Sequence, residues 1–315
     1  MNWQPSASLQ SLHQRAQLFA RIRMFFEKRQ ILEVETPLLG HTTVTDHQIH
    51  SISVPLNGRE RYLQTSPEYA MKRLLAAYRS SIYQICKAFR REELGRFHQP
   101  EFTMLEWYRV DFDHHALMDE VDLFFQTILH TLPAERFSYA NIFMGVLGID
   151  PHHADVDALA LCAARQRTGG ALSFQGTLDR DGWLNLLFSH YIEPDLGKKQ
   201  PVFIYDFPAS QAALARIRPG NPPLASRFEV YYRGMELGNG FHELGGAEEQ
   251  RLRFEHDLAV RSSNHMHAVP IDECLLGALA HGLPDCAGIA LGLDRLMMIA
   301  TESETIEDVL AFPVQ

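Results

Sequence analysis

Apolar positions change their spacing along the chain, and each change predicts a different element. Near the N-terminus they recur at three to four residues, at Leu12, Ala16, Phe19, Ile22 and Phe26. This period predicts a helix over about 11–29, with Ser6 or Ser8 as its N-cap. The next segment, ILEVETPLL, alternates and ends near Pro37, which predicts a strand. Proline cannot donate to a ladder, so Pro37 fits either a plain edge strand or a dimer seam.

The remaining pattern continues as strands and helices. Ser66 is a candidate cap with Pro67 at the first helical position, so a helix should follow through MKRLLAAY. Strands are predicted at 81–90 and 201–206, a hairpin at 227–237 around Gly234, helices at 117–129 and 247–261, and a strand that passes into a helix at 285–296. Residues 40–60 predict a polar loop with strands, and about 130–200 an inserted helical subdomain with loops at Pro133, 148–151 and Gly169-Gly170.

Strands therefore come from both ends of the chain, with hairpins and helices between them. This order favours an α+β fold with a mainly antiparallel sheet over alternating βαβ units. A length of 315 residues allows one large catalytic domain over 1–315.

Composition narrows the class. No apolar run approaches a membrane span, and the N-terminus lacks a signal peptide. The four cysteines form no C-x-x-C pair, which is typical of reduced thiols in a cytoplasmic protein. A net charge of −10 disfavours a large nucleic-acid footprint. The pairs His114-His115, His152-His153 and His265-x-His267 lack matching ligands, so we expect surface or turn histidines there.

The stretch 89–108, FRREELGRFHQPEFTMLEWY, carries the most chemistry. It interleaves arginines and glutamates with aromatic residues. Arginine binds phosphate in a bidentate manner, and a flat ring can stack on a base. The stretch therefore favours a site for a polyphosphate with an aromatic base. Gly95 is expected to allow the tight turn between its two strands.

Three motifs in order carry a resemblance. The helix, strand and Pro37 segment resembles motif 1 of class II aminoacyl-tRNA synthetases, FRREELGRFHQPEF resembles motif 2, and GIALGLDRL resembles motif 3. TSPE, HQPEFT and ELGNGF are similar to the lysyl subgroup. Motif 1 starts within the first dozen residues, which leaves no room for an N-terminal OB-fold anticodon-binding domain. With FPASQA, His242 and Ala290, the chain resembles the elongation factor P–(R)-β-lysine ligases, freestanding lysyl-synthetase paralogues.

The resemblance implies a role for individual residues. Arg90 and Arg295 would be catalytic, neutralising the phosphates of ATP, with Phe102 and Arg295 stacking on the adenine. The ATP site would comprise Arg90, Arg91, Glu92, Gln99, Phe102, Glu236, Leu237, Gly292 and Arg295. Glu236 and Glu243 would hold Mg²⁺. The site for a lysine-like substrate would comprise Ser66, Pro67, Glu68, Glu106, Tyr108, Asn239, Phe241, Glu243 and Ala290. Its carboxylates suit a substrate with two amines, because a buried ammonium needs a partner.

The implied activity is ATP-dependent activation of lysine or (R)-β-lysine as an adenylate, followed by transfer to a lysine of elongation factor P. A homodimer is implied by motif 1. Departures from the motifs are Arg91 and Gln99 in place of asparagines, and Gly245-Gly246 in place of Thr/Asn-Asp. The alternatives are aminoacylation of tRNA, which the acidic balance disfavours, a class II amidotransfer or asparagine-forming enzyme, and a non-catalytic regulatory paralogue that binds ATP and amino acid.

Overall fold

The structure is a computed structural model that describes residues 3–91, 94–166 and 178–314. The chain divides into two compact units. The first unit is formed by Met1–Asp113, Thr127–Leu129 and Glu243–Gln315, and the second by His114–Gln126 and His130–His242. Each unit is described by itself.

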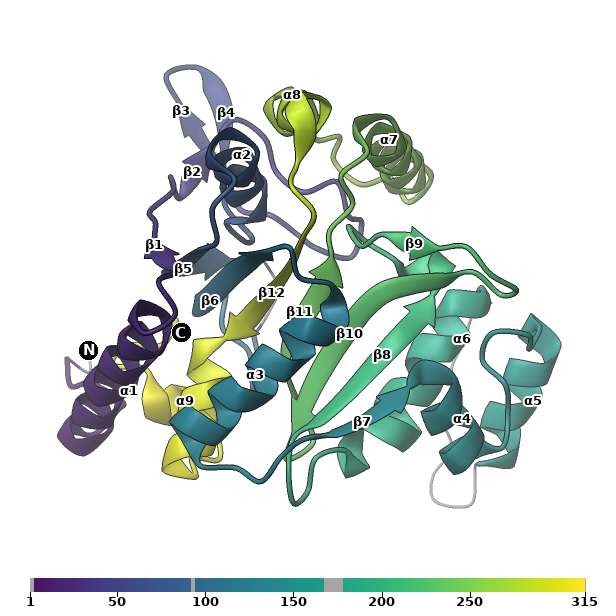
Figure 1. Cartoon of the computed structure of the whole chain (residues 1–315), viewed down its shortest axis with the longest axis horizontal. Coiled ribbons are helices and arrows are strands. Elements are labelled where there is room, and N and C mark those ends of the chain that lie inside the picture. The colour runs from purple at the N-terminus through teal and green to yellow at the C-terminus, as the bar shows by residue number, and fades with distance from the viewer. Residues whose placement is uncertain (1–2, 92–93, 167–177, 315) are drawn as a thin grey trace. The chain divides into compact units, whose positions relative to one another are not determined.

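The first unit contains a main sheet and a small one (Figure 1). The main sheet runs in the order β1 (Leu32–Glu33), β5 (Ile82–Phe89), β6 (Glu101–Val110) and β12 (Cys286–Gly292). The pair β1–β5 is parallel, while β5–β6 and β6–β12 are antiparallel. The small antiparallel sheet has the order β2 (Leu39–Gly40), β4 (Arg59–Leu63) and β3 (Ser53–Leu56).

Helices cover both faces of the main sheet. The described helices of this unit are α1 (Leu9–Glu27), α2 (Glu68–Tyr78), α7 (Ala247–Ser263), α8 (Glu273–Gly282), α9 (Leu293–Thr301) and the 3₁₀-helix η5 (Ile306–Val309). Phe26 of α1 stacks on Tyr83 at 4.2 Å and meets Trp107 edge-on at 5.4 Å between ring centroids. Met71 of α2 belongs instead to a buried cluster with Tyr108. Successive strand residues point to opposite faces, so α1 and α2 lie on opposite sides of β5 and β6.

The second unit is built on the strand order β11 (Met235–His242), β10 (Leu224–Tyr232), β8 (Val202–Pro208) and β7 (Glu135–Ser138), with β9 (Ile217–Arg218) also paired to β10. Only β7–β8 is parallel among these pairs. Its helices are most of α3 (His114–Leu129), α4 (Tyr139–Leu147), α5 (Val156–Arg165), α6 (Arg180–Leu187), the π-helix η2 (Phe188–Ile192), and the 3₁₀-helices η3 (Glu193–Asp195) and η4 (Ala209–Gln211). A buried cluster that includes Tyr139, Phe143 and Phe188 joins α4, α5, α6 and η2 to β8 and β10.

The predicted α+β class with mainly antiparallel pairing is confirmed. Ser8 caps α1 by accepting a hydrogen bond from the amide of Ser11 at 3.1 Å. The hairpin around Gly234 is longer than predicted, because β11 continues through the glycine-rich segment to His242. The predicted loop at 169–170 lies outside the described residues. That the chain forms one catalytic domain with a helical insertion stays a prediction.

Three sequence-based predictions were wrong in detail. Pro67 is the N-cap residue of α2 and not its first helical residue, and Ser66 precedes it. Gly95 has no positive φ; its backbone pairs with His98 across a turn formed by residues 96–97, so the freedom of glycine is not used. His114 is only 2% exposed, because it begins α3 beneath Asp206 of β8, with 3.6 Å between Nε2 and Oδ1.

Candidate active site

One face of β5, β6 and β12 presents three of the predicted substrate residues, Glu106, Tyr108 and Ala290. Glu106 lies opposite Gln84 on β5 and Ala290 on β12. Tyr108, two residues further along the same face, lies opposite Gly288. Directly paired residues of neighbouring strands point to the same side. The ladder thus brings residues that are almost 200 positions apart in the sequence onto one surface, beneath α2.

Glu68 and Glu243 come together around a lysine. Lys72 lies one turn after Glu68 on α2, and its Nζ is 2.7 Å from Oε1 of Glu68. The same Nζ is 2.6 Å from Oε2 of Glu243, and the side chains of Lys72 and Glu243 are each 1% exposed. The amide of Glu243 donates to the carbonyl of Cys286, which fixes this segment beside β12. We call Glu68, Lys72, Glu106 and Glu243 the carboxylate cluster.

The electrostatics of the carboxylate cluster are dominated by burial. Burial raises the pKa of Glu106 well above its ordinary value, with a further increase from the charge of Glu68. Burial also raises the pKa of Glu243, to about 7, although Lys72 opposes the shift. Burial lowers the pKa of Lys72, but the charges of Glu243 and Glu68 outweigh it and leave the pKa above its ordinary value. Lys72 is therefore a cation at neutral pH, while protons remain on part of the carboxylates.

Tyr108 ties Glu106 into the sheet. Its hydroxyl donates to Oε1 of Glu106 at 2.6 Å. Oε2 of Glu106 is buried and has no hydrogen-bond partner among the described residues. Buried polar atoms in folded proteins are nearly always paired. An unpaired oxygen of a carboxylate that interacts electrostatically with two others is therefore suited to a ligand that brings a positive charge.

Gly288 is a site residue that the sequence analysis did not identify. A Cβ at this position would overlap the ring of Tyr108 and lie 2.7 Å from Oε1 of Glu243. Only glycine lets these two side chains approach the strand so closely. Lys72 was also missed. Its signal was present in the sequence, because a lysine four residues after a helical glutamate faces the same way as that glutamate.

Motif 2 forms the β5–β6 hairpin as predicted. The guanidinium of Arg90 lies 5.2 Å from the ring centroid of Phe102, and the amide of Arg90 donates to the carbonyl of Pro100. The structure therefore brings two predicted ATP residues together. Arg91 is exposed, and its amide donates to the carbonyl of His50. Glu92 lies outside the described residues.

Motif 3 contacts the tip of the same hairpin. Gly292 is the N-cap residue of α9, and Arg295 lies in its first turn. Arg295 donates through Nε to the carbonyl of Phe97 at 3.2 Å, and its Nη2 is 2.6 Å from Nε2 of His98. The guanidinium is thus held by the motif 2 turn.

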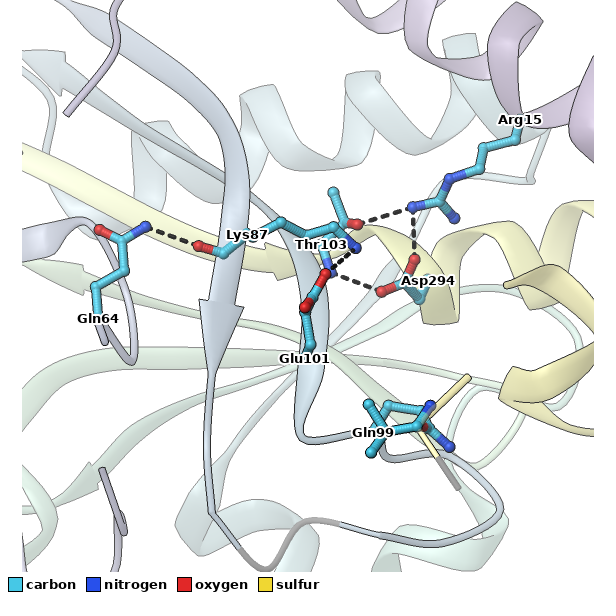
Figure 2. Close-up of polar contacts among 8 residues, drawn as sticks. Arg15, Gln64, Lys87, Gln99, Glu101, Thr103 and Asp294 are labelled. Atoms are coloured by element: carbon cyan, nitrogen blue, oxygen red, sulfur yellow. Dashed lines mark hydrogen bonds and ion pairs between the residues drawn. The ribbon is translucent and has the colours of Figure 1, made fainter. Parts of the chain in front are cut away.

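Gln99 is almost fully enclosed, at 1% exposure. Its Oε1 accepts a hydrogen bond from the amide of Val314 at 2.9 Å. Figure 2 places its side chain apart from the polar network of Arg15, Thr103 and Asp294. The carboxamide therefore anchors the C-terminal segment, and its contact with ATP stays a prediction.

The network in Figure 2 lies on the α1 side of the sheet. Arg15 of α1 forms an ion pair with Asp294 of α9 at 2.7 Å and donates to Oγ1 of Thr103 at 2.8 Å. Oδ2 of Asp294 accepts the amide of Thr103 at 2.6 Å. These contacts join α1, β6 and α9 directly behind the motif 2 and motif 3 residues.

The other predicted residues lie on the β10–β11 hairpin of the second unit. Oδ1 of Asn239 accepts from Nε of Arg227 at 3.2 Å, and Arg227 also pairs with Glu229. Phe241 lies opposite Arg227 in the ladder. The remaining members are Glu236 and the buried Leu237.

Among the residues that the structure describes, no group of three or more His, Cys, Asp or Glu side chains is placed to hold a metal ion. Within the same described residues, every helix is too short or too polar to span a bilayer. The four cysteines are free thiols.

Comparisons with known proteins agree with these features. The model of the family described as tRNA synthetases class II (D, K and N) matches residues 1–315. A protein of Vibrio cholerae serotype O1 named elongation factor P–(R)-β-lysine ligase is 51% identical over 99% of this chain and 98% of its own length. Proteins of the same name from Vibrio atlanticus and Salmonella paratyphi B are each 50% identical, over 99% of this chain and 98% and 97% of theirs. The chain belongs to the class II tRNA synthetase family and, within it, to the elongation factor P–(R)-β-lysine ligases.

Proposed function

We propose that this protein activates (R)-β-lysine or lysine with ATP and transfers it to a lysine side chain of elongation factor P. The names of its relatives supply the acceptor and the amino acid. The observation that carries the proposal is the buried carboxylate cluster. Three carboxylates face one lysine there, which leaves a deficit of positive charge that a diamine would fill. The free cysteines favour a cytoplasmic location.

The amine-binding residues of the proposal are Glu68, Glu106, Tyr108 and Glu243. Burial without a partner is costly for a charged group, so an ammonium and a buried carboxylate stabilise each other. Ala290 lies opposite Glu106 and Gly288 lies opposite Tyr108, so β12 contributes only small residues to this face of the sheet. An asparagine-forming enzyme would need cations where these glutamates stand, which argues against that alternative.

The nucleotide-binding residues of the proposal are Arg90, Phe102 and Arg295. The guanidinium of Arg90 forms a cation–π contact with the ring of Phe102 in the motif 2 hairpin. Arg295 holds that hairpin's turn through Phe97 and His98. Guanidinium groups suit phosphate oxygens because they offer paired donors in one plane. Phe102 offers a face for the adenine.

The chemistry proceeds in two steps. A carboxylate oxygen of the amino acid bonds to the α-phosphorus of ATP, and pyrophosphate leaves with the electrons of the broken P–O bond. The amine of an acceptor lysine then bonds to the activated carbonyl carbon, loses a proton, and AMP leaves. Side-chain nucleophiles are unnecessary, so Arg90 and Arg295 act by positioning and by neutralising charge.

Mg²⁺ bound to ATP would supply further neutralisation of the phosphates. The carboxylates predicted to hold it are Glu236 and Glu243. Glu243 fits less well, because its carboxylate is already paired with Lys72. We therefore assign Glu236 to the metal and Glu243 to the amines within this proposal.

Pyrophosphate exchange tests the activation step. The purified protein should exchange pyrophosphate into ATP with (R)-β-lysine or lysine, and should add one such residue to elongation factor P by intact mass. Glu106→Gln should raise KM for the amino acid, by roughly tenfold to hundredfold for a charged hydrogen bond. Charging of tRNA in place of elongation factor P would favour the rival synthetase activity. Exchange with none of the lysine isomers would overturn the proposal.

A homodimer through motif 1 is part of the proposal. Leu38 is 39% exposed beside Pro37, between the short strands β1 and β2. A charge placed at an apolar contact between subunits loses solvation without gaining a partner. Leu38→Glu should therefore shift the mass from dimer to monomer by light scattering, whereas Leu56→Glu, at a comparable 44% exposure, should not. An unchanged dimer for Leu38→Glu would contradict the assignment.

A further inference from the structure

We propose that Lys72 is a built-in counter-ion that sets the charge of the amine site for a substrate with two ammonium groups. The inference rests on the proposed function and adds a specificity-determining role for a residue that does not touch the reacting atoms. Lys72 acts through Glu68 and Glu243, so it is a positioning residue.

The contacts of Lys72 show how it is held. Its side chain is 1% exposed, and both of its anionic partners lie within 2.7 Å of Nζ. Glu68 belongs to the same helix, whereas Glu243 follows β11 and is bonded through its amide to Cys286 of β12. Lys72 therefore joins α2 to the β12 side of the site and fixes one oxygen of each carboxylate.

The charge count gives the reason for a lysine at this position. Glu68, Glu106 and Glu243 contribute three negative charges and Lys72 one positive charge, so the ionised cluster carries two negative charges. A diamine brings two positive charges and makes the sum zero. Without Lys72 the same diamine would leave one buried carboxylate unpaired. A substrate with a single ammonium leaves one unpaired when Lys72 is present.

Glu106 shows that the cluster is incomplete as it stands. Lys72 reaches Glu68 and Glu243, while Oε2 of Glu106 is buried with no hydrogen-bond partner among the described residues. Lys72 thus forms ion pairs with two of the three carboxylates and leaves the third for the substrate. A lysine that served packing alone would not need two carboxylates, because a methionine fills a similar volume.

The test compares lysine with norleucine, which lacks the ε-ammonium, in pyrophosphate exchange from pH 6 to 9. In Lys72→Met the carboxylates lose their nearest cation, so their pKa values rise. Ionised carboxylates bind the amines, so KM for lysine should rise at least tenfold at pH 7 and recover toward pH 9. KM should begin to rise at a pH about one unit higher in Lys72→Met than in the wild type. The kcat of the variant should stay within a few-fold of the wild-type value. The preference for lysine over norleucine should shrink.

A second variant restores the charge count. Lys72→Met with Glu68→Gln removes one cation and one anion, so the cluster again carries two negative charges. The pH profile of KM should return toward the wild type, even where KM itself stays raised. This pair also leaves fewer unpaired buried charges, so it keeps the test available if Lys72→Met alone does not fold. Lys198→Met, which removes an exposed lysine paired with Asp195, should change neither KM nor its profile.

The outcomes separate this inference from the proposed function. Exchange by the wild type, with an unshifted KM profile in Lys72→Met and no effect of the second substitution, would overturn the role of Lys72 alone. A fall in kcat without a change in the KM profile would do the same, because it indicates a structural lysine. No exchange by the wild type with any lysine isomer would overturn the proposed function, and this inference with it.

Discussion

The two faces of the β5–β6–β12 sheet each bury an ion pair, and the two differ in their balance of charge. On the α1 face, Arg15 meets Asp294, and the amide of Thr103 occupies the other carboxylate oxygen. On the α2 face, one lysine meets two carboxylates, with Glu106 beyond them. The first set balances one cation with one anion. The second has three carboxylates and one lysine, a deficit of positive charge that the proposed diamine would fill.

We interpret this difference as that between a structural network and the proposed amine site. Removing charges from water is costly, so a buried pair is tolerated when its groups satisfy one another. A carboxyl with a strongly raised pKa is one whose charged form burial disfavours, and such groups concentrate at functional sites. Glu106 and Glu243 have raised pKa values, mainly through burial. The α2 face therefore disfavours ionised carboxylates in the free protein, and the proposed diamine would favour them.

Gly288→Ala should break the α2 face most completely. The new Cβ would overlap the ring of Tyr108 and crowd Glu243. Overpacking of this kind costs about 1–3 kcal/mol of stability. We expect pyrophosphate exchange to fall by more than about a hundredfold, because the displaced side chains are the proposed amine ligands.

Gly277→Ala is the matched control. A Cβ at Gly277 of α8 meets no other atom within 4 Å. Alanine is the better helix former by about 1 kcal/mol, so stability should stay equal or rise. Exchange should be unchanged. Near-normal activity in Gly288→Ala would show that the close approach at β12 is not needed.

Arg15→Met should break the α1 face and leave the α2 face intact. The change strands Asp294, which is 2% exposed. Breaking a fully buried pair costs about 3–5 kcal/mol, and the partial exposure of Arg15 should reduce the loss to about 2–3 kcal/mol. Chemical denaturation should detect this loss. KM for the amino acid should keep its wild-type pH profile; a shifted profile would mean that the two faces are coupled.

The release of protons on lysine binding should further distinguish the α2 face from the α1 face. Glu106 and Glu243 hold protons near pH 7, because burial raises their pKa values, that of Glu243 to about 7. Ammonium groups pair with the ionised forms, so lysine binding should release protons, and KM should fall as pH rises through about 7. Calorimetry in buffers of different ionisation enthalpy measures the number released. Glu106→Gln should release fewer, and equal heats in all buffers would contradict the prediction.

The same shift has a consequence for the stability of the free protein. A carboxyl whose pKa is raised on folding binds more protons in the folded state than in the unfolded state. The free energy of unfolding should therefore decrease as pH rises from about 4.5 to about 7. These two values are the ordinary pKa of a glutamate and the raised pKa of Glu243 in the folded protein. Saturating substrate should reduce this decrease.

Lys87→Met should have the smallest effect. Lys87 and Glu101 pair at 3.3 Å on the α1 face, and their side chains are 40% and 47% exposed (Figure 2). Exposed pairs contribute about 0.2–1 kcal/mol at most. Stability should change by less than about 0.5 kcal/mol, with no change in exchange. A large loss of activity would show that this exposed pair also serves the site.

The sequence by itself determined the α+β class, the motif 2 hairpin and the passage of β12 into α9. Local spacing and residue type carry that information, because period and turn chemistry act between near neighbours. The candidate roles of Glu68, Glu106 and Glu243 followed from the resemblance of the motifs to the lysyl subgroup. The tertiary structure alone decided that Lys72 and Glu243, 171 positions apart, form an ion pair. It also decided that Gly288 must be a glycine and that Gln99 anchors Val314. These are properties of packing and burial, in which the charge of one segment is balanced by another that the fold brings close.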